Sequence, residues 1–347
     1  MAEAKIDIRD SDRQIWEQEL EDFVPMRVLD AHCHFFVRAH FRPDSPYIQK
    51  DKGRGMRADV DLRKLDEWAA ALYPGRQMFY LILGTPLPGI IVEQHVPYVA
   101  EQIRDKPHIR HNRVVTPDCR IEDIERDIRA HGFIGLKPYR LFATDGDINQ
   151  CRIEKFLSHE QMELANDMGL WVTMHLSRYD GCADEYNLND LEQYTTKRYP
   201  NIKWILAHCA RSFTYWPIRN AVDRLSAMPN IWYDLSAVTD PRPFVTLFTK
   251  EDHRRLFFGS DAVFAAYFHG CYQALGRSWQ HFNADQSVLN WPHCDGRPIL
   301  SVYEQLMSMK FAAEVAGLSR NQVEDIFWRN ATTALGIEVE AAAGTVS

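Results

Sequence analysis

Two histidines stand one residue apart in RVLDAHCHFF, residues 27–36, directly after an apolar run. A β-strand turns successive side chains to opposite faces, so residues i and i+2 point the same way. His32 and His34 would therefore present two imidazoles on one face, while Cys33 points away from them. Two neutral imidazoles suit a divalent metal such as Zn²⁺. The chain has 14 histidines, so an accidental pair is the alternative that the remaining sequence must exclude.

Eight short apolar, β-branched or aromatic runs alternate with helical patterns along the chain. The runs are residues 27–35, 77–84, 111–117, 133–139, 170–177, 203–209, 231–236 and 255–261. Strands that alternate with helices predict parallel βαβ units, and right-handed crossovers would close eight of them into a barrel. An open doubly wound sheet is the rival, but no G-x-G-x-x-G follows the first run. We therefore predict an α/β fold of the (β/α)₈ TIM-barrel type.

Three stretches lie outside this regular pattern. We expect residues 1–25 to form an N-terminal extension, and residues 26–340 to form a single catalytic barrel domain. Residues 36–60 and 280–300 are predicted as long loops after the first and the eighth strand. Long loops in a compact domain are often functional, although surface decoration is an equal alternative for the second one. Phe36, which begins the first loop, is a candidate substrate contact.

Side chains that could bind metal or move protons stand where the predicted strands end. In a barrel, the carboxyl ends of the strands meet on the face that carries the active site. The residues there are His32 and His34 on the first strand, Lys137 on the fourth, His175 on the fifth, His208 on the sixth and Asp261 on the eighth. A lone histidine in an apolar run is usually a packed residue bonded to a carbonyl. Three strands that all end in histidine favour a metal site instead.

These motifs resemble the amidohydrolase superfamily, in particular the amidohydrolase 2 branch, which includes aminocarboxymuconate-semialdehyde decarboxylase and related hydrolases. The resemblance rests on the H-x-H pair, GFIGLKPY at 132–139, VTMHLS with His175, ILAHCAR with His208 and FFGSDAV with Asp261. It covers nearly the whole chain, from LDAHCHFF to NATTALGI.

The resemblance implies one divalent ion, most readily zinc, with manganese or another divalent ion as the alternative. Its ligands would be His32, His34, His175 and Asp261. Such an ion lowers the pKa of a bound water from about 15.7 toward about 7. Asp261 would also take a proton from that water. His208 would hydrogen-bond the water, act as a general base or polarise the substrate, unless it is merely a packed histidine.

Basic residues near the strand ends suggest an anionic substrate. In other branches of the superfamily a lysine on the fourth strand is carboxylated and bridges two metals. We favour Lys137 as an uncarboxylated cation near the substrate. Arg140, Arg178 and Arg211 follow the ends of the fourth, fifth and sixth strands, and we expect at least one to bind a substrate carboxylate. For each arginine taken singly, a solvated loop charge or a structural ion pair is the alternative.

The function predicted from these features is hydrolysis by a metal-activated water. The target would be an amide, imide or lactone, that is a C–N or C–O bond, in a small anionic molecule. Non-oxidative decarboxylation is the alternative, and a catalytically silent binding barrel is a third one that the intact ligand set opposes. Decarboxylases of this branch often carry D-x-P after the last strand, whereas SDAVFAAYF stands here, which favours hydrolysis.

Composition narrows the class of protein further. The net charge is −8 and no Lys/Arg cluster stands out, so no nucleic-acid partner is expected. The seven cysteines are scattered without a C-x-x-C pair, which argues against a disulfide framework. No signal peptide and no membrane-spanning run are recognisable. We expect a cytoplasmic enzyme, and analogy with the family favours a homodimer.

Overall fold

The structure is a computed structural model that describes residues 6–49, 59–283, 293 and 295–338. Eight parallel strands form one sheet in sequence order. They are β1 (Arg27–Cys33), β2 (Gln77–Ile82), β3 (Ile109–Val114), β4 (Gly135–Lys137), β5 (Trp171–Met174), β6 (Lys203–Leu206), β7 (Ile231–Asp234) and β8 (Leu256–Phe257). Each of the eight predicted runs overlaps one of these strands, although β3 begins two residues before its run.

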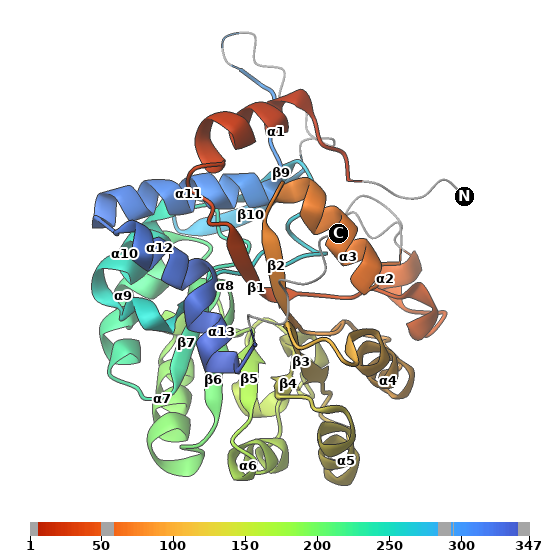
Figure 1. The fold of residues 1–347 in the computed structure, drawn as a ribbon. Coiled ribbons are helices and arrows are strands. Elements are labelled where there is room, and N and C mark those ends of the chain that lie inside the picture. The colour runs from red at the N-terminus through yellow and green to blue at the C-terminus, as the bar shows by residue number, and fades with distance from the viewer. Residues whose placement is uncertain (1–5, 50–58, 284–292, 294, 339–347) are drawn as a thin grey trace.

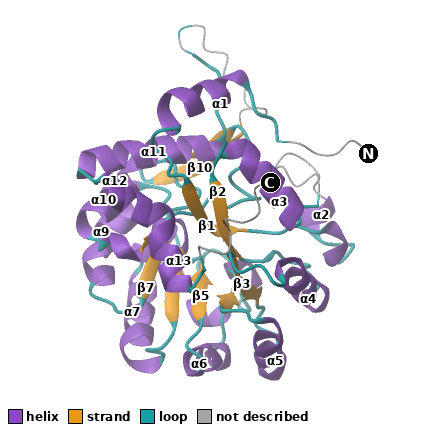
Figure 2. Cartoon of the chain, in the orientation of Figure 1, coloured by secondary structure: helices purple, strands orange, loops and turns teal. Residues whose placement is uncertain are grey.

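Backbone hydrogen bonds join the first strand to the last. The Ala31 N–H donates to the carbonyl of Phe258 at 2.9 Å, and the Asp261 N–H donates to the carbonyl of His32 at 2.8 Å. The sheet is thereby closed on itself, with helices around it (Figures 1 and 2). The predicted (β/α)₈ TIM barrel is confirmed.

Helices connect successive strands and cover the outside of the barrel. The main ones are α3 (Leu62–Leu72), α4 (Val92–Ile103), α5 (Ile121–His131), α6 (His159–Asp167), α7 (Glu185–Gln193), α9 (Tyr215–Ser226), α10 (Pro241–Lys250) and α11 (Ser301–Ala316). The short helices α12 (Arg320–Glu324) and α13 (Asn330–Leu335) end the described chain. Local sequence explains their limits: Ser158 caps α6 by accepting the Gln161 N–H, and Gly132 ends α5 with φ +71°.

Apolar side chains form two clusters. The larger one lies between the strands and the surrounding helices, and Cys33 belongs to it. The smaller one fills the barrel interior with side chains such as Leu29, Phe79, Leu81 and Phe257, and Leu335 of α13 packs against it. Cys33 therefore points away from the barrel interior, as the alternation in β1 predicted.

Strand β4 tolerates only glycine at its first position. A Cβ atom at Gly135 would lie 2.4 Å from the carbonyl oxygen of Trp171 and 2.6 Å from Oδ1 of Asn112. We expect Gly135→Ala to lower the free energy of unfolding by about 2–3 kcal/mol, because the backbone of β5 must move. Urea unfolding measures this. Gly135→Ser should cost at least as much, and wild-type stability in both variants would contradict the close approach of β4 and β5.

A β-hairpin follows β8 and differs from the predicted loop. Strands β9 (Gly270–Leu275) and β10 (Ser278–Asn283) pair in antiparallel fashion around a turn in which Gly276 has φ +63°. Residues 280–283, predicted as the start of a loop, are therefore strand. Two runs rich in aromatic residues on either side of Gly276-Arg277 favour this pairing. Residues 284–292 and 294 lie outside the described residues.

The predicted loop at 36–60 is only partly described. It contains the short helices η2 (Arg38–His40) and α2 (Pro46–Gln49), and it returns to the barrel through a bridge between Phe36 and Val60. Residues 50–58 lie outside the described residues.

The N-terminal segment packs on the barrel, next to α11 (Figure 1). It consists of α1 (Asp10–Ile15) and the turn η1 (Trp16–Leu20). The Trp16 and Tyr303 rings have centroids 5.8 Å apart, and Lys310 Nζ lies 2.8 Å from a carboxylate oxygen of Glu19. These contacts join the segment to α11.

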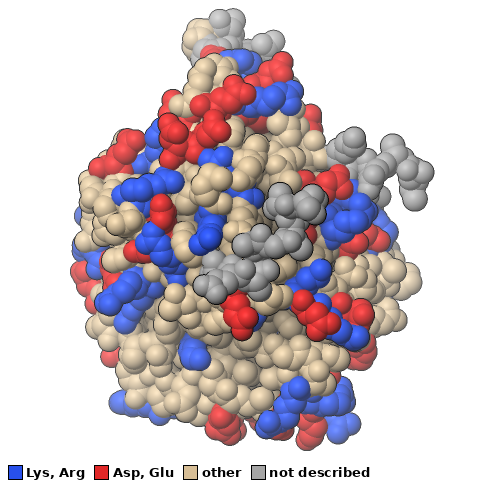
Figure 3. Space-filling model, viewed as in Figure 1, with Lys and Arg blue, Asp and Glu red and all other residues tan. Residues whose placement is uncertain are grey.

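The surface carries charges of both signs. On the face shown in Figure 3, lysine and arginine side chains are interspersed with aspartate and glutamate. Within the described ranges, every helix is too short or too polar to cross a membrane.

Candidate active site

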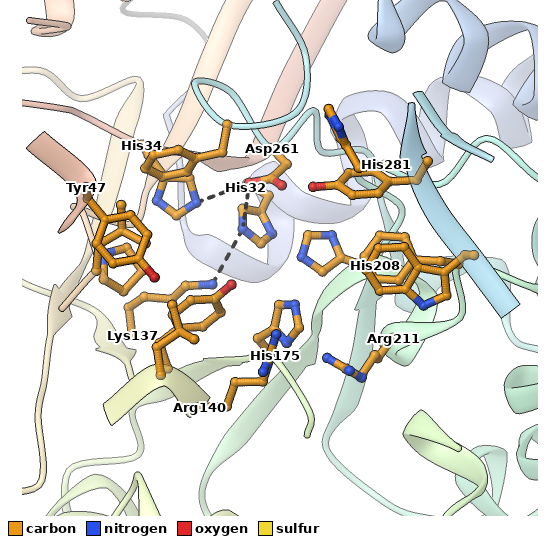
Figure 4. Close-up of a pocket in the computed structure, with 18 residues that line it drawn as sticks. His32, His34, Tyr47, Lys137, Arg140, His175, His208, Arg211, Asp261 and His281 are labelled. Atoms are coloured by element: carbon orange, nitrogen blue, oxygen red, sulfur yellow. Dashed lines mark hydrogen bonds and ion pairs between the residues drawn. The ribbon is translucent and has the colours of Figure 1, made fainter. Parts of the chain in front are cut away.

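Three predicted metal ligands meet at the carboxyl ends of β1 and β8 (Figure 4). His34 Nε2 lies 3.3 Å and His32 Nε2 lies 3.6 Å from Oδ1 of Asp261. One ligand atom from each residue lies within 4.8 Å of the other two. The pairing of β1 with β2 shifts register between Asp30 and Cys33, and such an irregularity re-aims side chains. Before the shift, Leu29 packs in the barrel interior; within and after it, His32 and His34 face the cavity.

The four histidines of the site all use Nδ1 to contact the protein. His32 contacts Asp234 Oδ2 at 2.8 Å, His34 the Gly84 carbonyl at 2.7 Å, His175 the Leu176 carbonyl at 2.9 Å, and His208 the Ser236 carbonyl at 3.1 Å. Carbonyl and carboxylate oxygens only accept, so each Nδ1 carries the proton. Each Nε2 then has a free lone pair, which is the tautomer that metal binding through Nε2 requires.

Burial sets the charge states of these groups. It lowers the pKa of His32 to about 3, and it also lowers the pKa values of His34 and His175. For Asp261, burial acts to raise the pKa, but the neighbouring His34 and His32 outweigh it and hold the pKa below its usual value. Two neutral imidazoles and an ionised carboxylate therefore face one point, and this donor set fits a divalent ion.

His175 and His208 lie beside this group. The His208 ring centroid is 4.9 Å from that of His32 and 5.0 Å from that of His175. His175 is not part of the close group formed by His32, His34 and Asp261. It lies next to His208, on the side of the cavity away from that group. His208 instead forms a second close group with His32 and Asp234.

Asp234, at the end of β7, was not among the predicted site residues. It is fully buried, and one carboxylate oxygen contacts His32 Nδ1 while the other accepts the backbone N–H groups of His208 and Ser236 at 3.2 and 3.1 Å. Burial acts to raise its pKa, but the interaction with His32 holds the pKa well below its usual value. The signal for this residue was present in IWYDLS, an apolar run that ends in a carboxylate as the eighth run does.

A left-handed turn carries His208 and Arg211 into the cavity. In α8 (Ala207–Arg211), the four residues from His208 to Arg211 have φ between +52° and +61°. The left-handed conformation costs about 1–2 kcal/mol for each residue other than glycine, and such strain concentrates at functional sites. Residues three apart on a helical turn share a side. Both His208 and Arg211 accordingly line the cavity.

The cavity beside the histidines has a volume of about 340 Å³. Its walls combine the metal-type group with basic and aromatic side chains (Figure 4). Besides the residues already described, the lining includes Tyr47, Leu87, Lys137, Tyr139, Arg140, Phe213, Phe264, Tyr272, Trp279 and His281. The last three come from the hairpin β9–β10, so this insertion forms part of the pocket wall.

The three predicted arginines separate into two kinds. Arg140 and Arg211 line the cavity, beside His175 in Figure 4. Arg140 donates to the Ile148 carbonyl and to Asn149 Oδ1, and Arg211 donates to the Leu176 carbonyl, but neither has a carboxylate partner among the described residues. Burial and the neighbouring Arg140 lower the pKa of Arg211 to about 10. Arg178 instead pairs with Asp184 at 2.6 Å and does not line the cavity.

Of the predicted substrate contacts Lys137 and Phe36, only Lys137 lines the cavity. Lys137 lines the cavity, with Nζ 3.5 Å from His32 Nε2, and burial lowers its pKa to about 8. Phe36 is fully buried, packs against Phe41 at a centroid distance of 5.4 Å and does not reach the cavity. The structure thus gives no support to Phe36 as a substrate contact, because its ring faces the core beneath the loop.

The chain is similar to known proteins in sequence pattern and in fold. A family model described as Amidohydrolase matches residues 29–337. A search of curated proteins gives no match. Solved structures similar to the chain include 5-carboxyvanillate decarboxylase from Sphingomonas paucimobilis, with TM-score 0.56 and 13% identity over 90% of this chain and 100% of that one.

Two further similar structures are also decarboxylases. One is 2,6-dihydroxybenzoate decarboxylase from Rhizobium, with TM-score 0.52 and 12% identity over 89% of this chain and 98% of that one. The other is dihydroxybenzoic acid decarboxylase from Polaromonas, solved with manganese and 2-nitroresorcinol, with TM-score 0.51 and 14% identity over 92% and 98%. At such identities the similarity shows the shared fold.

Proposed function

The chain belongs to the amidohydrolase family, and on this premise we propose that it is a metal-dependent enzyme acting on a small, planar, anionic molecule. One observation carries the proposal. The same 340 Å³ cavity is lined by a His–His–Asp group and by Arg140 and Arg211, which have no carboxylate partner among the described residues. The His–His–Asp group can hold a divalent ion, and the two arginines supply positive charge that an anionic ligand can neutralise.

We propose zinc as the resident ion, held by His32, His34 and Asp261, with His175 as a further ligand. Imidazole nitrogen and carboxylate oxygen are donors that zinc accepts readily, while manganese prefers more oxygen donors. When bound there, such an ion supplies a lowered pKa for a bound water and polarises a substrate oxygen. Metal analysis of the purified protein identifies the ion.

The protein side chains have separate tasks in this proposal. Asp261, held ionised beside His34, accepts a proton from the attacking water and delivers it to the leaving group. His208 presents the lone pair of Nε2 toward the cavity and accepts a hydrogen bond from the attacking water. Phe213, Tyr272 and Trp279 provide a wall of rings that excludes water and packs against a planar substrate.

We propose hydrolysis of a C–N or C–O bond as the reaction. It uses a base, Asp261, and a second polar group, His208, which line the same cavity. Non-oxidative decarboxylation is the second candidate. Three fold neighbours named as decarboxylases favour it, and so do Arg140 and Arg211, which have no carboxylate partner among the described residues and suit a carboxylated ring.

The two reactions leave different products. Incubation with a panel of aromatic carboxylates and of cyclic amides and lactones, in water enriched in ¹⁸O, separates them. Hydrolysis places the label in the product and releases no CO₂, whereas decarboxylation releases CO₂ without labelling the ring product. The absence of both in the metal-loaded protein over the whole panel would contradict this substrate class.

The arginine pair gives a matched test. We expect Arg211→Gln to weaken the binding of benzoate, used as a probe, by about 10- to 100-fold, because one hydrogen-bonded charge is lost. Arg178→Gln should leave benzoate affinity within about twofold of wild type, since Arg178 is paired with Asp184 away from the cavity. Calorimetric titration measures both. A larger loss in the Arg178 variant would place the anion site elsewhere.

The homodimer and the cytoplasmic location stay predictions. Sedimentation of the purified chain checks the first, and cell fractionation checks the second.

A further inference from the structure

The hairpin β9–β10 leaves and re-enters the barrel at one point. His269, just before β9, and Leu300, just before α11, form an antiparallel bridge. The Ser301 N–H donates to the Phe268 carbonyl at 2.8 Å beside it. This bridge, the base of the insertion, therefore fixes where the hairpin begins and where the chain returns.

A single carboxylate of the N-terminal segment holds both sides of that base. Asp12, in α1, is fully buried. Its Oδ2 lies 2.7 Å from His269 Nε2, and its Oδ1 accepts the Leu300 N–H at 2.8 Å. The Arg9 N–H also donates to Oδ2 at 2.7 Å. Every contact of this buried charge is thus made either to its own turn or to the base of the insertion.

The hairpin in turn forms the aromatic wall of the pocket. The Trp279 and Tyr272 ring centroids lie 4.5 and 5.1 Å from that of Phe213. Phe213 lies 5.2 Å from the ring of His208. A continuous series of contacts therefore runs from the base at His269, along β9, to a histidine of the active site.

Two hydrogen bonds also join the hairpin to the barrel outside its base. The Trp216 indole N–H donates to the Gly276 carbonyl at 3.3 Å, and Thr239 Oγ1 donates to the Tyr272 carbonyl at 2.7 Å. Each is a neutral hydrogen bond, worth about 1 kcal/mol. The contacts of the buried Asp12 are charge-assisted and stronger than either of these bonds, so the base contributes substantially to the placement of the hairpin.

We propose that Asp12 is a positioning residue of the active site, and that the N-terminal segment determines how well the pocket binds its substrate by fixing the aromatic hairpin. The inference rests on the proposed function only in taking the cavity as the substrate site. Loss of Asp12 frees His269 and the Leu300 N–H, so the wall carried by Tyr272 and Trp279 loses its fixed position while the metal-type group keeps its own supports.

Hydrogen exchange tests this placement without any substrate. In the full-length protein with Asp12→Asn, amides of residues 270–283 should exchange about tenfold faster or more, while those of β1 and β2 keep wild-type rates. Asp10→Asn is the control, because Asp10 is exposed on the same helix and pairs only with Arg13 there. Unchanged exchange in the hairpin, or an equal increase throughout the barrel, would overturn the proposal.

Ligand binding gives the second readout. We expect Asp12→Asn to weaken benzoate binding about tenfold while the affinity for Zn²⁺ changes less than twofold. His269→Phe should reproduce this effect, and His269→Gln, whose amide can still donate to Asp12, should restore much of it. A loss of zinc affinity equal to the loss of benzoate affinity would show a general structural role and refute positioning.

The proposed function and this inference can fail separately. If wild-type protein does not bind benzoate, the proposed substrate class is wrong, and the hydrogen-exchange comparison still decides whether Asp12 fixes the hairpin. If benzoate binds and all Asp12 and His269 variants bind it as wild type does, the inference alone is wrong.

Discussion

His34→Ala is expected to weaken divalent metal binding by more than about 100-fold and to abolish turnover. Removal of an outer partner of a metal ligand typically costs 10- to 100-fold, so removal of a ligand costs more. His34 is well prepared for this role, because Gly84 fixes its Nδ1 proton and its Nε2 lies 3.3 Å from Asp261. Competition with a chelating dye measures the affinity, and metal analysis measures the content after dialysis.

Thermal unfolding gives an independent measure of the same loss. Metal present at about 100 times its Kd should stabilise wild-type protein by about 2.7 kcal/mol, and this gain should vanish in the His34 variant. His131→Ala, at the exposed end of α5, serves as the control and should keep the gain. Full metal-dependent stabilisation of the His34 variant would contradict the proposed site.

Asp234→Asn is expected to weaken metal binding about 10- to 100-fold and to lower the free energy of unfolding by about 3 kcal/mol. Oδ1 of Asp234 accepts the N–H groups of His208 and Ser236, so the amide group of asparagine must face His32. His32 then has to carry its proton on Nε2, and its lone pair no longer points at the metal position. Dye competition and urea unfolding measure the two effects.

An exposed carboxylate provides the matched control. Asp223→Asn removes a surface ion pair with Lys250 and should change neither quantity by more than about 0.5 kcal/mol. A protein with Asp234→Asn that binds metal as tightly as wild type would mean that His32 does not ligate through Nε2.

The barrel could be predicted from the sequence because two independent signals mark its strands. Each apolar run is short and is separated from the next by a helical pattern, and several runs end in polar residues such as His34, His175 and Asp261. The hairpin lacked this regularity. Its strands carry exposed polar residues, so no strand was predicted at residues 270–283, although the Gly276-Arg277 turn was a usable signal.

Which basic residues face the cavity could not be predicted. Arg178 and Arg211 each follow the end of a strand, but Arg178 meets Asp184 of its own connection whereas Arg211 stands on a left-handed turn that aims it at the cavity. Phe36 follows His34 by two residues, yet its ring turns into the core. The folded path of each connection decides which partner a side chain meets, and the local sequence does not specify that path.

The seam between β1 and β8 links the chemistry of the site to the order of folding. His32 and Asp261 share a backbone hydrogen bond across that seam, so the group of ligands exists only when the first and last strands have met. Such distant contacts form late, because a long loop must close first. The nascent chain therefore has no complete site until its last strand is in place. Metal uptake would follow barrel closure. Metal that stays bound in a cell would therefore show that β1 and β8 are still paired.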